Sequence, residues 1–177
     1  MVVLHHDEGS IVTLEDNGLV KKVVLGKKSS GLRWGISPEE LVNREIKALE
    51  LIVDVDGAQK LVERVSATSF TSQYIEGKSL RDHCEILPRS YFDELVDIME
   101  KCHERGVHRL GLTRADFLVT PKKRPAVVDF GNIILIDDPI ARIPGVLELA
   151  EVYNFLKAYE LRRKYTTQHE VALARTR

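Results

Sequence analysis

Asp129 is the strongest candidate in this sequence for a residue with a chemical role, because of the residues that surround it. It follows the short apolar run 126–128 and is itself followed by Phe130 and Gly131. The apolar run predicts a buried strand, and the glycine lets the chain turn away after it. The carboxylate would therefore stand at the exposed end of a strand, although the three letters Asp-Phe-Gly also occur by chance in unrelated proteins.

A lysine and a glutamate far upstream are candidates for a buried ion pair. Lys21 and Lys22 lie in the run 19–25, which predicts a strand, and alternation points only one of them to the inner face. Glu45 shares a helical face with apolar residues, where a carboxylate is costly unless it is paired. A strand lysine is its natural partner. The alternatives are a solvated edge strand and a glutamate at the border of an apolar stripe.

Turn and capping signals predict the elements that would position these residues. Asn17-Gly18 is a hairpin signal among three expected N-terminal antiparallel strands, and Ser37-Pro38 begins a helix that runs to about Val53. The further expected elements are strands at 60–65, 69–75 and 117–119, a helix from a capping Ser90 to Glu104 stopped by Gly106, and a helix at 146–165 followed by a polar tail that frays.

The composition predicts one soluble, folded unit. The chain has 177 residues, of which 44% are hydrophobic and 30% charged, which suffices for one core or for two small lobes sharing a cleft. Lysine plus arginine (26) nearly cancels aspartate plus glutamate (27), so no global field favours nucleic acid or an anionic membrane. Cys84 and Cys102 match no metal motif, and no targeting or transmembrane segment is evident. We therefore expect a cytoplasmic protein.

The order of these parts resembles the protein-kinase-like superfamily: a hairpin with a lysine, a helix with a glutamate, a strand with a glycine turn, a helix, a loop and then Asp-Phe-Gly. Because the chain is short, it resembles most the small bacterial lipopolysaccharide-kinase (WaaP-type) and RIO-like branch of this superfamily. The resemblance implies an α+β, two-lobed fold. Residues 1–76 would form a small antiparallel-sheet lobe with one helix, and residues 77–177 a truncated, mostly helical lobe.

The resemblance also implies a site for ATP. Lys21 or Lys22 would hold the α- and β-phosphates, and Glu45 would orient that lysine. The backbone near Gln73 and Ile75 would hydrogen-bond the edge of adenine, just before the chain turns at a glycine. A plain turn is the alternative interpretation of this last segment.

The expected catalytic loop departs from the family. The resemblance places Mg²⁺ on Asp129 and on Asp116, which stands where the family has an asparagine. Five residues before Asp116, at the position of the catalytic aspartate, stands Gly111, which can accept no proton. Arg109 then occupies the family's histidine position. If the loop slips by one residue His108 takes that position, and the critical position still lacks an acid.

Two functions follow from this comparison. The first is an ATP- and Mg²⁺-dependent phosphotransferase that acts weakly on a small molecule or a sugar-lipid. The second is a pseudokinase, a nucleotide-binding or inert module that acts by binding a partner. No glycine-rich phosphate lid and no long activation segment are evident, which argues against a conventional protein-substrate kinase. Whether the chain is an enzyme stays open at this point.

The histidines match no metal motif in the sequence. Cys102 and His103 are adjacent, and a predicted helix end at Gly106 separates His103 from His108. We therefore expect no zinc site among them.

Overall fold

A computed structural model describes the backbone of residues 1–25, 35–83 and 85–175, and the side chains as far as Thr166. Lys27, Arg33 and Cys84 lie outside the described residues. The elements, in chain order, are β1 (Val2–His6), β2 (Ser10–Leu14), β3 (Leu19–Val24), α1 (Pro38–Leu51), β4 (Leu61–Ser66), β5 (Ser69–Gln73), β6 (Lys78–Ser79), α2 (Arg89–Glu104), β7 (Val107–Arg109), β8 (Phe117–Val119), β9 (Pro125–Val127), β10 (Ile133–Leu135), the 3₁₀ helix η2 (Pro139–Arg142) and α3 (Val146–Arg175).

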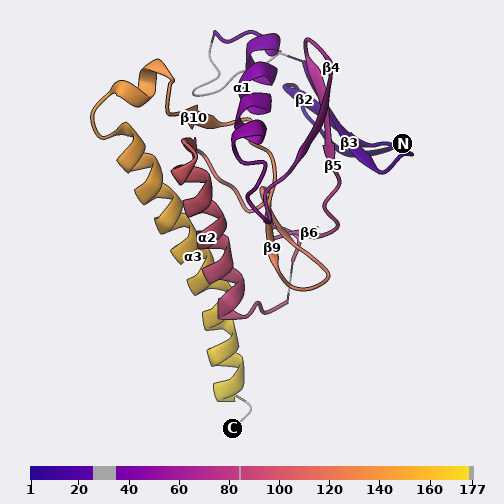
Figure 1. The fold of residues 1–177 in the computed structure, drawn as a ribbon. Helices are drawn as coiled ribbons and strands as arrows, with labels where there is room; N and C mark the ends of the chain where they lie inside the picture. The colour runs from indigo at the N-terminus through magenta and orange to yellow at the C-terminus, as the bar shows by residue number, and fades with distance from the viewer. Residues whose placement is uncertain (26–34, 84, 176–177) are drawn as a thin grey trace.

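A five-stranded antiparallel sheet forms the N-terminal part, in the order β1-β2-β3-β5-β4. The predicted hairpin at Asn17-Gly18 is confirmed, because β2 pairs with β3 and Gly18 adopts a φ of 78°, which glycine tolerates without strain. Helix α1 packs against β3, β4 and β5 (Figure 1). Its predicted start is also confirmed, since the Ser37 hydroxyl accepts a hydrogen bond from the Glu40 amide at 3.1 Å.

Helices α2 and α3 pack against each other beyond this sheet (Figure 1). Short strands connect them to the sheet, with β7 paired to β10, and β8 placed between β6 and β9. The core is continuous and is centred on large buried side chains: Phe70, Leu80, Tyr91, Phe92, Leu95, Phe117, Phe130 and Leu161.

Two predicted helix boundaries were wrong. The N-cap of α2 is Pro88, and Ser90 lies inside the first turn. Helix α3 continues to Arg175, without the fraying tail expected after residue 165. No glycine or proline interrupts the chain from 146 to 175, so nothing in the local sequence stops the helix.

The predicted fold class is confirmed as α+β, with an antiparallel sheet and, among the described residues, three α-helices. Within the described residues, no helix combines the length and the apolar character needed to cross a membrane.

Candidate functional site

Lys22 is the centre of a three-residue ion-pair group. Its Nζ donates to Glu45 Oε1 at 2.8 Å and to Asp129 Oδ1 at 2.7 Å. The side chains of Lys22 and Glu45 are only 11% and 3% exposed. These contacts join β3, α1 and the segment after β9, three parts of the chain that are distant in sequence.

The register of β3 decides which of the two lysines takes this place. Along the strand Val20, Lys22 and Val24 are buried, whereas Lys21 is half-buried. Because side chains alternate between the two faces of a strand, Lys21 points away from Glu45. The sequence had left this choice open.

The electrostatic environment keeps Lys22 charged. Burial by itself lowers the pKa of Lys22, but the negative charges of Asp129 and Glu45 outweigh that effect and raise the pKa above its ordinary value. The lysine therefore carries its full positive charge at neutral pH, next to two carboxylates.

Asp129 is held in an uncommon backbone conformation, with a φ of 61°. Its amide donates to Gln59 Oε1 at 3.1 Å, and its carbonyl accepts from the Arg109 guanidinium. The side chain remains 51% exposed. The backbone is thus fixed, while about half of the carboxylate side chain faces solvent. Neither Gln59 nor this role of Arg109 was identified from the sequence, where no local pattern marks such long-range contacts.

Asp116 lies close enough to Asp129 for their charges to interact. Its Oδ2 accepts from the Thr113 amide at 2.6 Å and lies 3.7 Å from Arg109 Nη2. Burial raises the pKa of Asp116, Arg109 opposes this shift, and the charge of Asp129 adds to it. Two carboxylates that repel each other in this way can be stabilised together by a divalent cation between them.

Gly111 lies at a position that is open to a side chain but has a restrictive backbone. Its φ is 68°, and a Cβ added there would meet only Asn132 Nδ2, at 3.9 Å. The preceding amide, of Leu110, donates to the Asn132 carbonyl at 3.0 Å. The loop therefore lies directly beside the segment that follows Asp-Phe-Gly.

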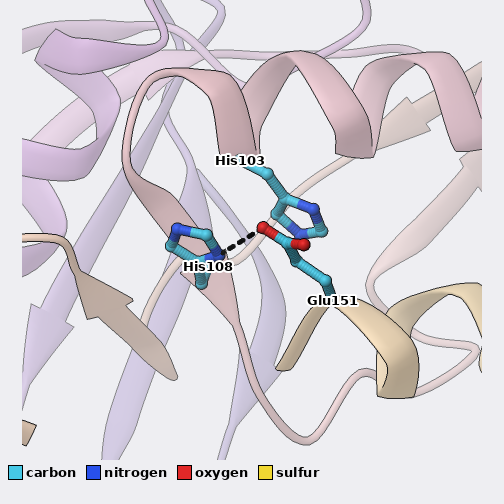
Figure 2. Close-up of side chains that lie close together, drawn as sticks. All are labelled: His103, His108 and Glu151. Atoms are coloured by element: carbon cyan, nitrogen blue, oxygen red, sulfur yellow. Dashed lines mark ion pairs between the residues drawn. The ribbon is translucent and has the colours of Figure 1, made fainter. Parts of the chain in front are cut away.

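His108 does not join this group through any contact that the described residues show. Its ring stacks on His103 and lies near Glu151 (Figure 2). Arg109, the next residue of β7, contacts the Val128 and Asp129 carbonyls and lies over the Phe130 ring. The placement of His108 thus argues against its use as a substitute catalytic residue.

The segment expected to hold adenine runs from the end of β5 to β6. The Gln73 amide donates to the Lys60 carbonyl at 2.9 Å, and Ile75 is half-buried in the following connection. A Cβ on Gly77 would lie 2.9 Å from the Val119 carbonyl oxygen. Glycine is therefore needed for close approach to β8, and the adenine-binding role of this segment stays a prediction.

An ion pair that the sequence did not reveal ties α1 to the chain after β10. Arg44 donates to Asp138 Oδ2 at 2.6 Å and to the Ile133 carbonyl at 3.1 Å, and Asp138 also accepts from the Leu135 amide at 2.7 Å. Because Arg44 adjoins Glu45, this contact holds the helix at the residue that meets Lys22. The only hint in the sequence was a charged residue next to Glu45.

Comparisons with known proteins agree with this geometry. No family model matches the chain. The chain is 28% identical over 129 residues to CBL-interacting protein kinase 15 of Oryza sativa subsp. japonica, covering 67% of this chain and 29% of that protein. It is 27% identical over 123 residues to CBL-interacting serine/threonine-protein kinase 21 of Arabidopsis thaliana, covering 65% and 29%. The chain thus spans less than a third of these relatives.

A solved structure extends the likeness over most of the chain. The crystal structure of the Rio2 kinase-ADP/Mg²⁺-phosphoaspartate complex from Chaetomium thermophilum matches with a TM-score of 0.65 and 12% identity, over 90% of this chain and 54% of that chain. Identity this low is evidence of a shared fold alone. The chain therefore has a protein-kinase-like fold.

Proposed function

We propose that this chain binds Mg·ATP and transfers phosphate slowly to a small molecule or a sugar-lipid. The observation that carries the proposal is the placement of Lys22 between the buried Glu45 and the exposed carboxylate of Asp129. The ammonium group is held by Asp129 together with Glu45. Phosphate oxygens of ATP would replace the Asp129 carboxylate as acceptors, which frees Asp129 for the cation.

Each member of the group has a distinct role in this proposal. Lys22 neutralises the α- and β-phosphates, and Glu45 fixes the direction of its side chain. Asp129 and Asp116 provide the oxygen ligands that Mg²⁺ prefers. The fit is supported by the mutual repulsion of the two carboxylates, which a cation would relieve. Bound Mg²⁺ would offset charge on the transferred phosphoryl group, while the backbone from Gln73 to Ile75 would position adenine.

The rate of transfer is proposed to be low because of Gly111. Base assistance contributes about 10²–10⁴-fold to such reactions, and this loop has no carboxylate at that position. A pseudokinase is the second candidate, favoured by the same glycine. We retain residues 1–76 and 77–177 as the proposed lobes, and the lipopolysaccharide-kinase or RIO-like branch as the proposed relationship.

Thermal unfolding with and without Mg·ATP tests nucleotide binding. At about 100 times Kd the ligand adds about 2.7 kcal/mol of stability, which corresponds to a rise in Tm of roughly 5–11 °C for a chain of this size. Asp129→Asn should abolish the rise, whereas Asp56→Asn, at an exposed carboxylate, should retain it. No rise in the wild-type protein at millimolar Mg·ATP would overturn the proposal.

A turnover assay separates the two candidates once binding is established. Release of phosphate from ATP that disappears in Asp129→Asn would support the phosphotransferase. Binding without any release, in the presence of candidate acceptors, would leave the pseudokinase.

A further inference from the structure

Three side chains from three separate elements meet on the side of β7 that is turned away from Arg109. His103 comes from the last turns of α2, His108 from β7 and Glu151 from the second turn of α3 (Figure 2). One ring nitrogen of each histidine and one carboxylate oxygen of Glu151 all lie within 4.8 Å of one another. We propose that His103, His108 and Glu151 form a binding site for a divalent transition-metal ion, Zn²⁺ in particular.

The polar atoms of this cluster are incompletely satisfied by the protein. The His108 side chain is only 4% exposed, and its Nδ1 has no hydrogen-bond partner among the described residues. Glu151 Oε1 lies 3.7 Å from that nitrogen, which is too far for a hydrogen bond. Buried polar groups are almost always paired. A cation between the nitrogen and the carboxylate would supply the missing partner.

The two imidazoles stack on each other, so one of them must rotate before both can direct a ring nitrogen at the same ion. Their rings are nearly parallel, at an interplanar angle of 8° and a centroid separation of 5.0 Å. Burial lowers the pKa of both rings, and the neighbouring His108 lowers that of His103 further. Both are therefore neutral at pH 7, which is the form that coordinates a metal.

Asn154, one turn after Glu151 on α3, fixes the ring of His103. Its Nδ2 lies 2.9 Å from His103 Nε2, and its own Oδ1 is buried without a partner. With its amide as placed, Asn154 donates to Nε2; turned by 180°, its Oδ1 would accept from Nε2–H, which is the outer contact that orients metal-binding histidines. The Glu151 side chain, by contrast, is 43% exposed, so it provides both the mobile ligand and the path for an ion from solvent.

The ligand set favours zinc over magnesium or calcium. Two neutral imidazoles and one carboxylate suit Zn²⁺, whereas Mg²⁺ and Ca²⁺ prefer oxygen ligands. Zinc–ligand distances of about 2.0–2.2 Å place tetrahedral ligand atoms about 3.3 Å apart. The cluster must therefore contract by roughly 1.5 Å around the ion, which requires rotation of the half-exposed Glu151 side chain and of at least one imidazole. A fourth position remains for water.

Zinc titration of the full chain, after treatment with EDTA, tests the site. We expect one Zn²⁺ per chain, a rise in Tm of at least about 5 °C at 100 times Kd, and absorption bands of tetrahedral Co²⁺ when cobalt replaces zinc. Glu151→Gln should weaken binding by about tenfold or more. The matched control is Glu160→Gln, an exposed glutamate farther along the same helix that pairs with Lys157, which should bind zinc as the wild-type protein does.

The zinc titration does not depend on replacing either buried histidine, which could prevent folding. Because Glu151 is partly exposed, Glu151→Gln should fold, and its own Tm without metal shows whether it does. No zinc-dependent rise in the wild-type protein would overturn the proposal and leave an ordinary histidine–glutamate contact. An equal rise in wild type and Glu151→Gln would also overturn it, because zinc would then bind elsewhere. Mg·ATP binding is measured separately, so either proposal can fail alone.

Discussion

Replacement of Lys22 by methionine should strongly destabilise the protein even without nucleotide. The change removes the cation from two carboxylates in unlike surroundings. Asp129 is 51% exposed and can be hydrated again, but the Glu45 side chain is 3% exposed. Breaking a buried ion pair by removing one partner costs about 3–5 kcal/mol. Nearly all of the loss should therefore arise at Glu45.

Urea unfolding of four variants measures this effect. Lys22→Met should lower the free energy of unfolding by about 3 kcal/mol or more, or Tm by roughly 6 °C or more. Glu45→Gln should cost less, about 1–2 kcal/mol, since its amide oxygen can still accept from the lysine. The double variant Lys22→Met/Glu45→Leu should recover much of the loss, because no charge is then left buried.

Lys21→Met is the matched control, since Lys21 is the neighbouring residue of β3 and points away from Glu45. Its effect should stay within about 0.5 kcal/mol. If Lys22→Met and Lys21→Met were equally mild, Lys22 would not be paired with Glu45 in solution, and the central contact of the proposed site would be refuted.

Three further predictions follow from other contacts. Gly111→Asp should raise ATP turnover about 10²-fold or more above Gly111→Asn, since both bear the strain of a φ of 68° but only aspartate accepts a proton; equal turnover would contradict the assignment of this position. Asp138→Ala should cost about 1.5–3 kcal/mol in urea unfolding, because Arg44 loses its carboxylate; a loss below about 0.5 kcal/mol would show that this ion pair does not hold α1. Burial and the adjacent His108 lower the pKa of His103 from 6.5 to about 4, so the unfolded chain binds more protons in this range. The stability of EDTA-treated protein should therefore fall as pH drops from 6.5 towards 4, and His103→Gln should flatten that dependence; an unchanged slope would assign it to other groups.

Much of the fold followed from interactions between residues close in sequence. The hairpin at Asn17-Gly18 and the Ser37 cap of α1 depend on backbone conformation and on hydrogen bonds spanning a few residues, so local patterns predicted them. The order of elements followed for the same reason, and the α+β class was implied by the family resemblance of that order. The end of α3 did not, because no stop signal is present and the polarity of the tail was interpreted as fraying.

Within the candidate site, the sequence predicted the residue types but not their contacts. It indicated that Glu45 needs a cation and that one of two lysines would provide it. The choice of Lys22 required the pairing of β3 with β5 and the packing of α1 on the sheet, which set the inward face of the strand. The support of Asp129 by Gln59 and Arg109 likewise joins residues 70 and 20 positions apart.

The cluster of His103, His108 and Glu151 marks the limit of spacing arguments most clearly. A helix end between the two histidines was interpreted as separating them, because along the chain they lie on different elements. The turn at Gly106, with a φ of 74°, instead folds β7 back against α2, and α3 brings the glutamate to both rings. Motifs and caps are encoded by neighbouring residues, whereas a site assembled from three elements exists only once the core has determined how they pack.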